Sequence, residues 1–462
     1  MTTDPHTQPQ PHLSGNNAPV ADEVEATELR VTGDIPSFLA GTFYRNGPNP
    51  RTGWSAHLFD GDGMIHALEV AGGRAVRYWN RYVRTPLYEQ PGASRFDLAF
   101  DRQTSTIDYR VSTANTSVVV DDGRLLALEE GGLPYELTRD LETVGPFTFG
   151  GQLRTPMTAH PKRCPLTGDL LFFGYRLTRP YLTYYRRPGN GAPLVAEPID
   201  LPIPTMMHDF AITATNVIFL DSPIVFDRRG AASGGSPWRW DDDHGARFGV
   251  MPRDGSSADV RWFEVEPGHV SHVANAHETE DGRIEVTGTR LPRTDDTALG
   301  DSALGGFGGG LPVMHRWTID VTRGTTTERP LDDVSTEYPR IADDRTGLPN
   351  CFVYSTTFAL EATPDHAEVL RYDTAGGGSV TRHRFPRGHT CGEPIFVARS
   401  GDADEDDGVV LTWAHDRGSG SSYLTILDAA NLASSPLAEI HVGRRVPNGF
   451  HGTWLAHESR ND

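Results

Sequence analysis

Short runs of β-branched and aromatic residues, each followed by a cluster of turn residues, recur along the whole chain. Turn clusters such as TAGGGS and DRGSGSS separate these runs. Such alternation is typical of antiparallel strands joined by hairpins, and amphipathic helix patterns are scarce. The sequence therefore predicts an all-β fold. The clearest predicted strands are 170–177, 216–227, 367–373, 408–416 and 422–429.

Few closures suit an all-β chain of this size. The chain has 462 residues, of which 37% are hydrophobic, enough for two or three ordinary domains or one large domain. A sandwich of this length would be unusual, whereas a propeller of about six to eight four-stranded blades fits. Residues 1–24 are polar and rich in Pro, Gln, Thr and Asn, and we expect them to form a disordered tail. Residues 25–462 are predicted to form a single domain.

Charge and cysteine content exclude several classes of protein. With 62 acidic residues against 42 lysines and arginines, the net charge is −20, which argues against a nucleic-acid partner. Cys164, Cys351 and Cys391 are odd in number and widely spaced, so we expect reduced thiols. Neither a signal-peptide pattern nor an apolar run of about 18 residues is seen, so we expect a cytoplasmic protein without a membrane span.

Four histidines lie at the start or end of strand-like segments: His160, His208, His272 and His451. No two have the spacing of a metal finger, so only a closed fold could bring them together. Their intervals match one, one and about three propeller blades. Four neutral imidazoles at one point would suit a borderline divalent metal such as iron. Because the chain has 18 histidines, residue type alone gives these four no preference over the others.

A series of motifs in order along the chain resembles the carotenoid cleavage oxygenases, a family that includes retinal-pigment-epithelium isomerase and the lignostilbene dioxygenases. The resemblance covers nearly the whole ordered chain, which makes the series far more specific than any one motif. The motifs include FYRNGPNP (43–50), HLFDGDGMIHAL (57–68), TAHPKRCPLTGDLLFFGY (158–175), MHDFAIT (207–213), HVANAHE (272–278), EYPRI (337–341), GEPIFVAR (392–399) and VPNGFHGTWL (446–455).

The resemblance implies a seven-bladed β-propeller with iron on its axis and a cap of loops and short helices over one face. It implies one Fe(2+) per chain, bound by His160, His208, His272 and His451. The family pattern selects His272 over its neighbours His269 and His277, which we interpret as loop or second-layer residues.

The resemblance also assigns three glutamates, Glu130, Glu337 and Glu393, as acceptors of hydrogen bonds from the far nitrogens of three ligands. Such carboxylates orient each imidazole and fix its tautomer. On sequence alone each would be an ordinary solvated or strand-end carboxylate. The pairing of glutamates with histidines is left open, except that His160 has no such partner in the family pattern.

The implied activity is cleavage by O2 of a conjugated C=C bond in a carotenoid or apocarotenoid, giving two carbonyl products without an organic cofactor. The alternative substrate is a stilbene or phenylpropanoid alkene, such as lignostilbene, isoeugenol or a vinylphenol. Lignostilbene-cleaving members carry a lysine where this chain has Glu129, which cannot supply a cationic contact to a phenolate. Carotenoid cleavers tend to have a small or aromatic residue there, so Glu129 matches neither group.

Two further hypotheses are an isomerase–hydrolase on the same iron and a non-catalytic propeller with a vestigial site. The intact set of histidines and glutamates argues against the second. The implied partners are an apolar polyene or aromatic alkene and O2, with an apolar mouth that could touch a membrane peripherally; no protein partner is inferred.

Aromatic residues near loops are candidates for the lining of the substrate tunnel, with plain core packing as the competing interpretation. Two other segments invite a site but lack its spacing. Residues 305–310 (GGFGGG) are predicted to be a flexible loop instead of a phosphate cradle, and residues 402–408 (DADEDDG) a solvated turn instead of a calcium loop. The aromatic candidates are Phe43, Phe59, Tyr109, Phe307 and Phe450.

Overall fold

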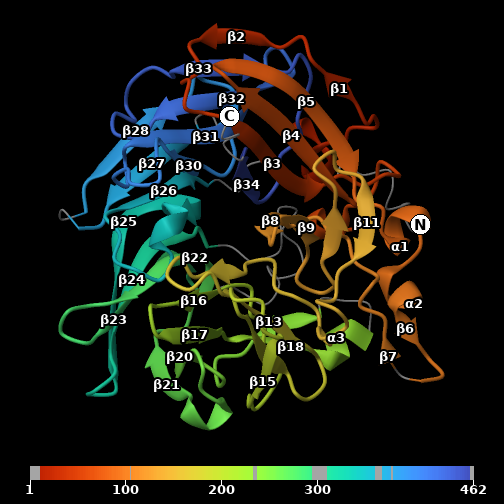
Figure 1. Cartoon of the computed structure of the whole chain (residues 1–462). Coiled ribbons are helices and arrows are strands. Elements are labelled where there is room, and N and C mark those ends of the chain that lie inside the picture. The colour runs from red at the N-terminus through yellow and green to blue at the C-terminus, as the bar shows by residue number, and fades with distance from the viewer. Residues whose placement is uncertain are drawn as a thin grey trace.

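Seven blades of antiparallel strands surround one axis in the part of the chain that the computed structural model describes (Figure 1). The described residues are 11–104, 106–232, 237–293, 310–358, 367–375 and 378–457. The predicted all-β propeller is confirmed. Residues 1–10 and most of 293–311, including Phe307, lie outside the described residues.

The first four blades follow the chain, with the exception of one closing strand from its end. Blade 1 contains β1 (Glu25–Ala26), β5 (Arg74–Tyr82), β4 (Gly63–Ala71), β3 (Gly41–Pro48) and β34 (Gly452–Ala456). Blade 2 contains β8 (Ser117–Asp121), β9 (Arg124–Leu128), β10 (Tyr135–Leu137) and β11 (Thr143–Pro146). Blade 3 contains β12 (Lys162–Arg163), β13 (Leu170–Tyr175), β14 (Leu182–Arg187) and β15 (Val195–Ile199). Blade 4 contains β16 (Phe210–Ile212), β17 (Asn216–Asp221), β20 (Ala246–Pro252) and β21 (Arg261–Val265).

Blades 5 and 6 share one long strand, β25 (Thr325–Arg340), whose first part pairs with β24 and whose end pairs with β26. Blade 5 adds β22 (His269–Glu278), β23 (Ile284–Leu291) and β24 (Val313–Asp320). Blade 6 adds β26 (Phe352–Thr357), β27 (Glu368–Asp373) and β28 (Val380–Arg384). Blade 7 contains β29 (His389–Cys391), β30 (Ile395–Ala398), β31 (Gly408–Asp416), β32 (Ser421–Asp428), β33 (Ala438–His441) and β2 (Arg30–Gly33).

Helices are short and connect or flank the blades. Two small hairpins also lie outside the blades, β6 (Phe100–Asp101) with β7 (Thr106–Ile107), and β18 (Ile224–Phe226) with β19 (Trp238–Trp240). Among the described residues no helix is long and apolar enough to cross a membrane. The helices are α1 (Pro86–Glu89), α2 (Arg95–Ala99), α3 (Arg228–Ala232) and the 3-10 turns η2 (Pro11–Leu13), η3 (Gly15–Asn17), η4 (Leu58–Asp60), η5 (Ser257–Asp259) and η6 (Asp343–Arg345).

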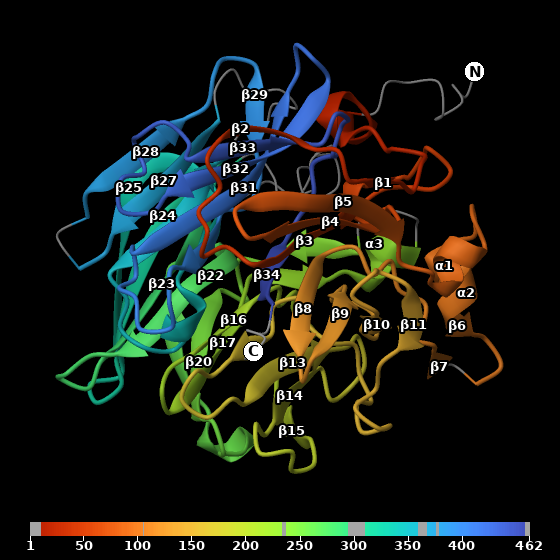
Figure 2. The same ribbon diagram turned by 45° about the horizontal axis from the view of Figure 1, so that its top comes forward.

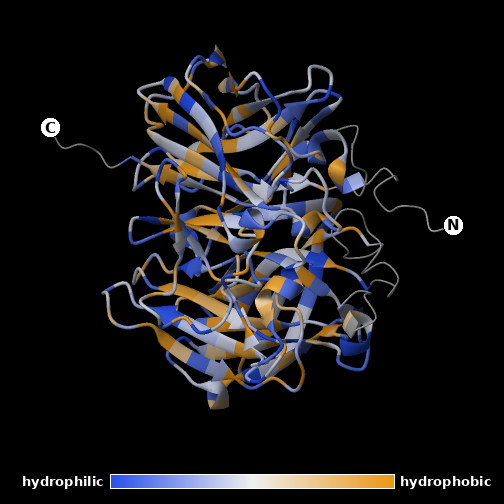
Figure 3. Ribbon diagram, turned by 90° about the vertical axis from the view of Figure 1, so that its right-hand side faces the viewer, coloured by the Kyte–Doolittle hydropathy of each residue, from blue (hydrophilic) through white to orange (hydrophobic). Residues whose placement is uncertain are grey.

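The hydrophobic core is divided among the interfaces between neighbouring blades. Strand β13 shows why: its residues alternate between two faces, and both faces are covered. Leu170 and Phe172 pack toward blade 2, whereas Leu171 and Phe173 pack toward blade 4. An apolar run such as LLFF therefore reads as a strand that is buried on both sides. Elsewhere, hydrophobic and hydrophilic residues are interleaved along the strands (Figure 3).

The ring is closed twice by pairing strands from opposite ends of the chain. Strand β34 pairs antiparallel with β3, with Arg45 opposite Gly452, and β2 pairs with β33. Figure 2 shows β34 beside β3 and β8 near the centre of the ring. This closure removes the free edges that an open sheet of this size would carry.

The prediction of a disordered tail through residue 24 is wrong for residues 11–24. Asn16 is buried and donates its amide to Oδ1 of Asn448 (2.7 Å), and Val20 N donates to Oδ1 of Asn49 (2.8 Å). Arg445 donates to the carbonyls of Ala18 and Pro19. Composition gave the wrong answer because this mostly polar segment is held by hydrogen bonds to other parts of the chain, with only Val20 and Val24 packed against the core.

Candidate metal centre and substrate cavity

The four predicted histidines enter the centre from four different blades. His160 precedes β12, His208 precedes β16, and His451 precedes β34, so three of them occupy the approach to an innermost strand. His272 lies within β22, where the register with β23 shifts on both sides of it. A β-bulge of this kind re-aims a side chain out of the regular alternation.

The close approach of strands β34 and β3 explains why a glycine, Gly452, follows His451. A Cβ on Gly452 would lie 2.6 Å from the carbonyl oxygen of Tyr44 on the paired strand β3. No side chain fits there, so glycine lets β34 dock and carry His451 to the axis.

The four imidazoles meet through their Nε2 atoms. Nε2 of His160 lies 3.0 Å from Nε2 of His208, which lies 3.3 Å from Nε2 of His272. Nε2 of His272 is in turn 3.2 Å from Nε2 of His451. All four potential ligand atoms lie within 4.8 Å of one another.

This donor set fits a divalent metal ion. Ligand nitrogens about 2.1 Å from a metal and at right angles to each other are about 3 Å apart, which matches the separations here. The donors are imidazoles, which suit zinc, copper, iron and nickel. Four nitrogen lone pairs directed at one point would repel each other unless a cation or protons lay between them.

Three carboxylates fix the far side of three of these rings. Nδ1 of His208 lies 2.7 Å from Oε2 of Glu130, and Nδ1 of His272 lies 2.6 Å from Oε2 of Glu337. Nδ1 of His451 lies 2.9 Å from Oε1 of Glu393. No such contact to His160 is found in the described part of the chain. An Nδ1–H donated to a carboxylate leaves Nε2 as the free lone pair, which is the tautomer that a metal ligand needs.

The glutamates come from the three blades that supply no histidine. Glu130 follows β9 of blade 2, Glu337 lies in the blade 6 part of β25, and Glu393 lies between β29 and β30 of blade 7. Each blade therefore directs one side chain of this set to the axis. The pairing that the sequence left open is thus Glu130 with His208, Glu337 with His272, and Glu393 with His451.

Each carboxylate also has a second set of hydrogen-bond donors. The hydroxyl of Tyr175 donates to Oε1 of Glu130 (2.9 Å), and the hydroxyl of Ser271 donates to Oε1 of Glu337. Glu393 accepts from the backbone N–H of Gly452 (2.7 Å) at Oε2 and from Arg340 at Oε1 (3.4 Å). All six carboxylate oxygens therefore have a donor, which holds the imidazoles rigidly.

Burial and these contacts set the protonation of the centre. Burial opposes ionisation of Glu337, but the neighbouring His272 and the donated hydrogen bonds outweigh it and lower its pKa to about 2. Burial also acts against ionisation of Glu393, yet Arg340 and His451 lower its pKa. Burial, reinforced by the other imidazoles, holds the pKa of His160 well below its usual value. Ionised carboxylates and a neutral His160 are what a cation at this point requires.

Tyr338 is a site residue that sequence reasoning missed. Its ring lies 5.6 Å from that of His272 and 5.4 Å from that of His451, between centroids. Its backbone has φ of 57°, an uncommon conformation for a residue with a bulky side chain. Its N–H donates to Oε2 of Glu337 (3.0 Å). The only feature of the sequence that could have identified Tyr338 was its position directly after Glu337.

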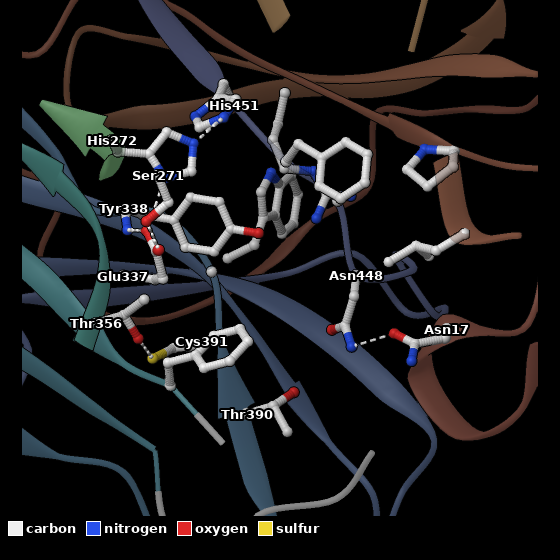
Figure 4. A pocket seen from close by; sticks show the side chains of 18 of the residues that line it. Asn17, Ser271, His272, Glu337, Tyr338, Thr356, Thr390, Cys391, Asn448 and His451 are labelled. Carbon is white, nitrogen blue, oxygen red and sulfur yellow. Dashed lines mark hydrogen bonds and ion pairs between the residues drawn. The ribbon is translucent and has the colours of Figure 1, made fainter. Parts of the chain in front are cut away.

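A mostly apolar cavity of about 260 Å³ adjoins the histidines. Figure 4 shows His272 and His451 on one side of it and Asn17 and Asn448 on the opposite side. A second cavity of about 570 Å³ lies against the same centre, and its lining is more polar and includes the charged groups Lys162, Asp209 and Arg340. An apolar ligand has its natural place in the first cavity.

The aromatic candidates for tunnel lining divide between the wall and the core. Phe59 and Phe450 line the apolar cavity, with ring centroids 5.4 Å apart. Phe43 packs in the core between blades 1 and 7, and Tyr109 against the core between blades 2 and 3, so neither lines this cavity.

Two histidines next to the centre were interpreted as loop or second-layer residues. His269 and His277 lie on β22 and not in a loop. His269 is buried in the cavity wall, and burial lowers its pKa to about 3, so it stays neutral. His277 points to Glu285 at 3.9 Å, away from the four histidines.

Glu129 does not face the cavity. Its two oxygens accept hydrogen bonds from Nη1 (3.1 Å) and Nη2 (2.8 Å) of Arg95. The hydroxyl of Ser112 and the N–H of Gly131 also donate to it. The residue that matched neither substrate pattern therefore stabilises the turn that carries Glu130.

A seven-bladed propeller with four histidines and three supporting carboxylates on its axis defines a class of non-haem metal protein. Comparisons with known proteins place the chain in that class. Residues 17–456 match the family model described as retinal pigment epithelial membrane protein. A carotenoid cleavage oxygenase of Mycobacterium tuberculosis is 34% identical over 98% of this chain and 99% of its own. Carotenoid 9,10(9',10')-cleavage dioxygenase 1 of Arabidopsis thaliana is 34% identical over 97% of this chain and 90% of its own.

Solved structures agree. Lignostilbene dioxygenase of Pseudomonas brassicacearum superposes with a TM-score of 0.83 at 29% identity, covering 97% of this chain and 98% of that one. A mutant of Synechocystis apocarotenoid oxygenase gives 0.82 at 28% identity, covering 95% and 97%. The chain belongs to the carotenoid cleavage oxygenase family of non-haem iron dioxygenases.

Proposed function

We propose that this protein binds one Fe(2+) through Nε2 of His160, His208, His272 and His451 and uses O2 to cleave a conjugated C=C bond of a carotenoid or apocarotenoid. The observation that carries the proposal is the convergence of four Nε2 atoms at separations of 3.0 to 3.3 Å. Three of these rings are held through Nδ1 by carboxylates, which leaves their lone pairs free for a metal.

When bound, ferrous iron would supply the site at which O2 is activated beside the alkene. The electrons come from the alkene, since both atoms of O2 end in the two carbonyl products and no external reductant is needed. The chain's own residues orient the ligands, exclude water and position the double bond. Glu130, Glu337 and Glu393 keep three imidazoles in one tautomer and orientation, while the walls of the cavity exclude water and hold the double bond next to the centre.

The lining and the volume of the cavity support an apolar substrate of which one segment lies inside. Its volume of about 260 Å³ is below the range of about 300–1,000 Å³ that is common for ligand pockets. A long polyene would therefore place one segment inside and extend beyond the cavity. The position at which lignostilbene-cleaving members carry a lysine holds Glu129, which lies outside the cavity and supplies no cation to a phenolate, and this favours the polyene over a stilbene.

A stilbene or phenylpropanoid alkene is the second candidate. The likeness to lignostilbene dioxygenase is at least as high as to the apocarotenoid enzyme, and a cavity of this volume would hold a short aromatic alkene. A direct competition of substrates separates the two candidates.

The test is aerobic incubation of iron-loaded protein with carotenoids, apocarotenals, stilbenes and vinylphenols, with aldehyde products identified by mass spectrometry. We expect aldehydes from the polyenes, with label from 18O2 in both products. His208→Ala is the control and should be inactive. Products from stilbenes alone would overturn the substrate class, and an inactive wild-type protein that stays iron-free after anaerobic Fe(II) loading would overturn the function.

A further inference from the structure

Tyr338 directs its hydroxyl into the apolar cavity beside the four histidines. Figure 4 shows the ring next to His272, with the hydroxyl pointing away from Glu337 toward the middle of the cavity. In the described part of the chain the backbone N–H of Tyr338 donates to Glu337, whereas the side-chain hydroxyl has no hydrogen-bond partner. A polar group that reaches a cavity without a partner in the protein is available to a ligand.

A β-bulge brings the side chain of Tyr338 to the cavity. The register between β25 and β26 shifts between Glu337 and Arg340, so Tyr338 lies in an irregular stretch of the strand. Neighbouring side chains of a regular strand point to opposite faces, yet Glu337 and Tyr338 both line the cavity. The bulge therefore adds a second cavity-facing side chain next to the carboxylate that supports His272.

The backbone conformation of Tyr338 is strained. Its φ of 57° lies in the left-handed region, which a residue with a bulky side chain rarely adopts. Such strain persists where the surrounding structure imposes it, and it is concentrated at functional sites. Here the conformation lets the N–H bind Glu337 while the ring lies against His272 and His451.

The hydroxyl of Tyr338 stays protonated and can therefore donate. Burial, with the negative charges of Glu337 and Glu393, raises the pKa of Tyr338 and outweighs the opposite effect of Arg45. Arg45 is 4% exposed, forms no ion pair in the described chain and donates to the carbonyl of Pro447 (2.7 Å). Its nearby positive charge strengthens the phenol as a donor, because it stabilises the partial negative charge that donation leaves on the oxygen.

Tyr338 differs in this respect from other hydroxyls of the cavity wall. The hydroxyl of Ser271 donates to Oε1 of Glu337, and that of Thr116 donates to Oδ1 of Asn115 (3.0 Å). Thr390 lies on the side of the cavity away from His272 and His451 (Figure 4). Tyr338 therefore supplies an available hydroxyl donor next to the metal centre.

The reaction itself provides an acceptor for this donor. The hydrocarbon segment of a polyene beside the metal centre carries no oxygen, so it offers the Tyr338 hydroxyl nothing to bind. Cleavage by O2 breaks the C=C bond and forms one C=O bond on each carbon, which uses both oxygen atoms. Two carbonyl oxygens, each a hydrogen-bond acceptor, therefore arise where the double bond lay.

We propose that the hydroxyl of Tyr338 donates a hydrogen bond to the carbonyl oxygen of one aldehyde product and holds that product beside the metal centre. This inference rests on the proposed function and deepens it, because it assigns a product-binding residue to the same cavity. The bond forms with the product and not with the hydrocarbon segment of the substrate, so it slows release of the aldehyde.

The first measurement is binding without turnover. Iron-loaded protein is titrated under anaerobic conditions with retinal and with axerophtene, the hydrocarbon that carries a methyl group in place of the aldehyde. Quenching of tryptophan fluorescence reports binding. In Tyr338→Phe, which keeps the ring and loses only the hydroxyl, the preference for retinal over axerophtene should fall about three- to tenfold. An unchanged preference would overturn the proposal.

A spectroscopic measurement separates hydrogen bonding from packing. The carbonyl stretch of bound retinal, read by Raman spectroscopy, should lie at a lower frequency in the wild-type protein than in Tyr338→Phe, because a donated hydrogen bond weakens the C=O bond. Thr390→Val is the matched control, since it removes a hydroxyl from the same cavity away from the imidazoles, and it should leave the frequency unchanged. A low frequency that persists in Tyr338→Phe would place the carbonyl on the metal and overturn the proposal.

Steady-state kinetics distinguish the aldehyde of the product from that of an apocarotenal substrate. Tyr338→Phe should weaken inhibition by the aldehyde product and leave KM for the apocarotenal unchanged. A raised KM with unchanged product inhibition would assign the hydroxyl to the substrate's own aldehyde and overturn the proposal. Binding of retinal that depends on Tyr338, in a protein that cleaves no alkene, would support the carbonyl-binding role while the proposed function fails.

Discussion

The two sides of the apolar cavity treat their polar groups in opposite ways. On the metal side, all six oxygens of Glu130, Glu337 and Glu393 accept hydrogen bonds from the protein. Among the described residues, Nε of Arg45 and Nε1 of Trp413, on two other residues of the wall, have no hydrogen-bond partner. A satisfied network fixes geometry, so the first group prepares a rigid set of imidazoles. Buried donors without a partner lower the stability of the second group instead.

The largest expected effect is removal of one ligand on the metal side. His208→Ala should lower iron from one atom per chain to a trace and abolish alkene cleavage, because the remaining nitrogens leave one side of the site open. Metal analysis and product assay measure the two effects. His277→Ala is the control and should retain iron; loss of iron in both variants would contradict the assignment.

Loss of a supporting carboxylate should have a smaller but measurable effect on metal binding. Glu337→Gln keeps the size of the side chain but removes the charge that holds His272, and a decrease of about 10–100-fold in metal affinity is expected. Competition with a metal chelator measures the affinity. Glu129→Gln is the matched control in the same type of environment, and an equal loss of affinity there would remove the distinction between the two glutamates.

The acid stability of the metal-free protein tests the same network. The pKa of Glu337 is about 2 in the folded chain and 4.5 in the reference state. Its carboxylate therefore contributes stability that is fully present above pH 4.5 and is lost as the pH falls toward 2. In Glu337→Gln the free energy of unfolding should decrease less steeply over this interval, as measured by denaturant titration at several pH values. Identical slopes would show that the pKa is not lowered.

Two tryptophans test the premise that the indole of Trp413 has no partner. Nε1 of Trp240 donates to Oδ1 of Asp242 (3.0 Å), whereas Nε1 of Trp413 donates to nothing in the described chain. Replacement by Phe removes the same atoms in both cases. Trp240→Phe should therefore cost about 1 kcal/mol more in the free energy of unfolding than Trp413→Phe. A larger cost for Trp413→Phe would mean that its N–H is already bound.

The smallest effect is expected at Glu129. Its partner Arg95 has a side chain that is 39% exposed, so solvent weakens the ion pair. Glu129→Gln should lower the free energy of unfolding by less than about 1 kcal/mol and leave the iron content unchanged. Thermal unfolding and metal analysis check both parts, and a loss of iron would tie Glu129 to the metal side after all.

Sequence patterns predicted the strands well where alternation was uninterrupted. The predicted strand 408–416 coincides with β31, whereas 216–227 divides into β17 and β18 around Ser222 and Pro223. Proline cannot donate to a ladder, so this division was visible in principle. The tail at residues 11–24 was missed because its partners are far from it in sequence, from Asn49 for Val20 to Asn448 for Asn16.

Motifs identified the residues of the centre but not their relations. His160, His208, His272 and His451 could be selected by resemblance, yet the pairing of Glu130 with His208 depends on which blades adjoin across the axis. The same holds for Tyr338, which is identified as a site residue only by the contact of its ring with two imidazoles. That Arg45 lacks a carboxylate is a property of its surroundings, and no local pattern around FYRNGPNP reveals it.

The position of His451 next to the closing strand determines when in synthesis the set of four histidines is completed. Because β34 pairs with β3 and follows His451 directly, the last ligand and the last blade-closing strand emerge from the ribosome together. A chain that ends before Phe450 would retain the pairing of β2 with β33 but would lack the second closure by β34 and the fourth histidine. The four-histidine centre is therefore complete only when β34, the last strand of the described chain, has been made.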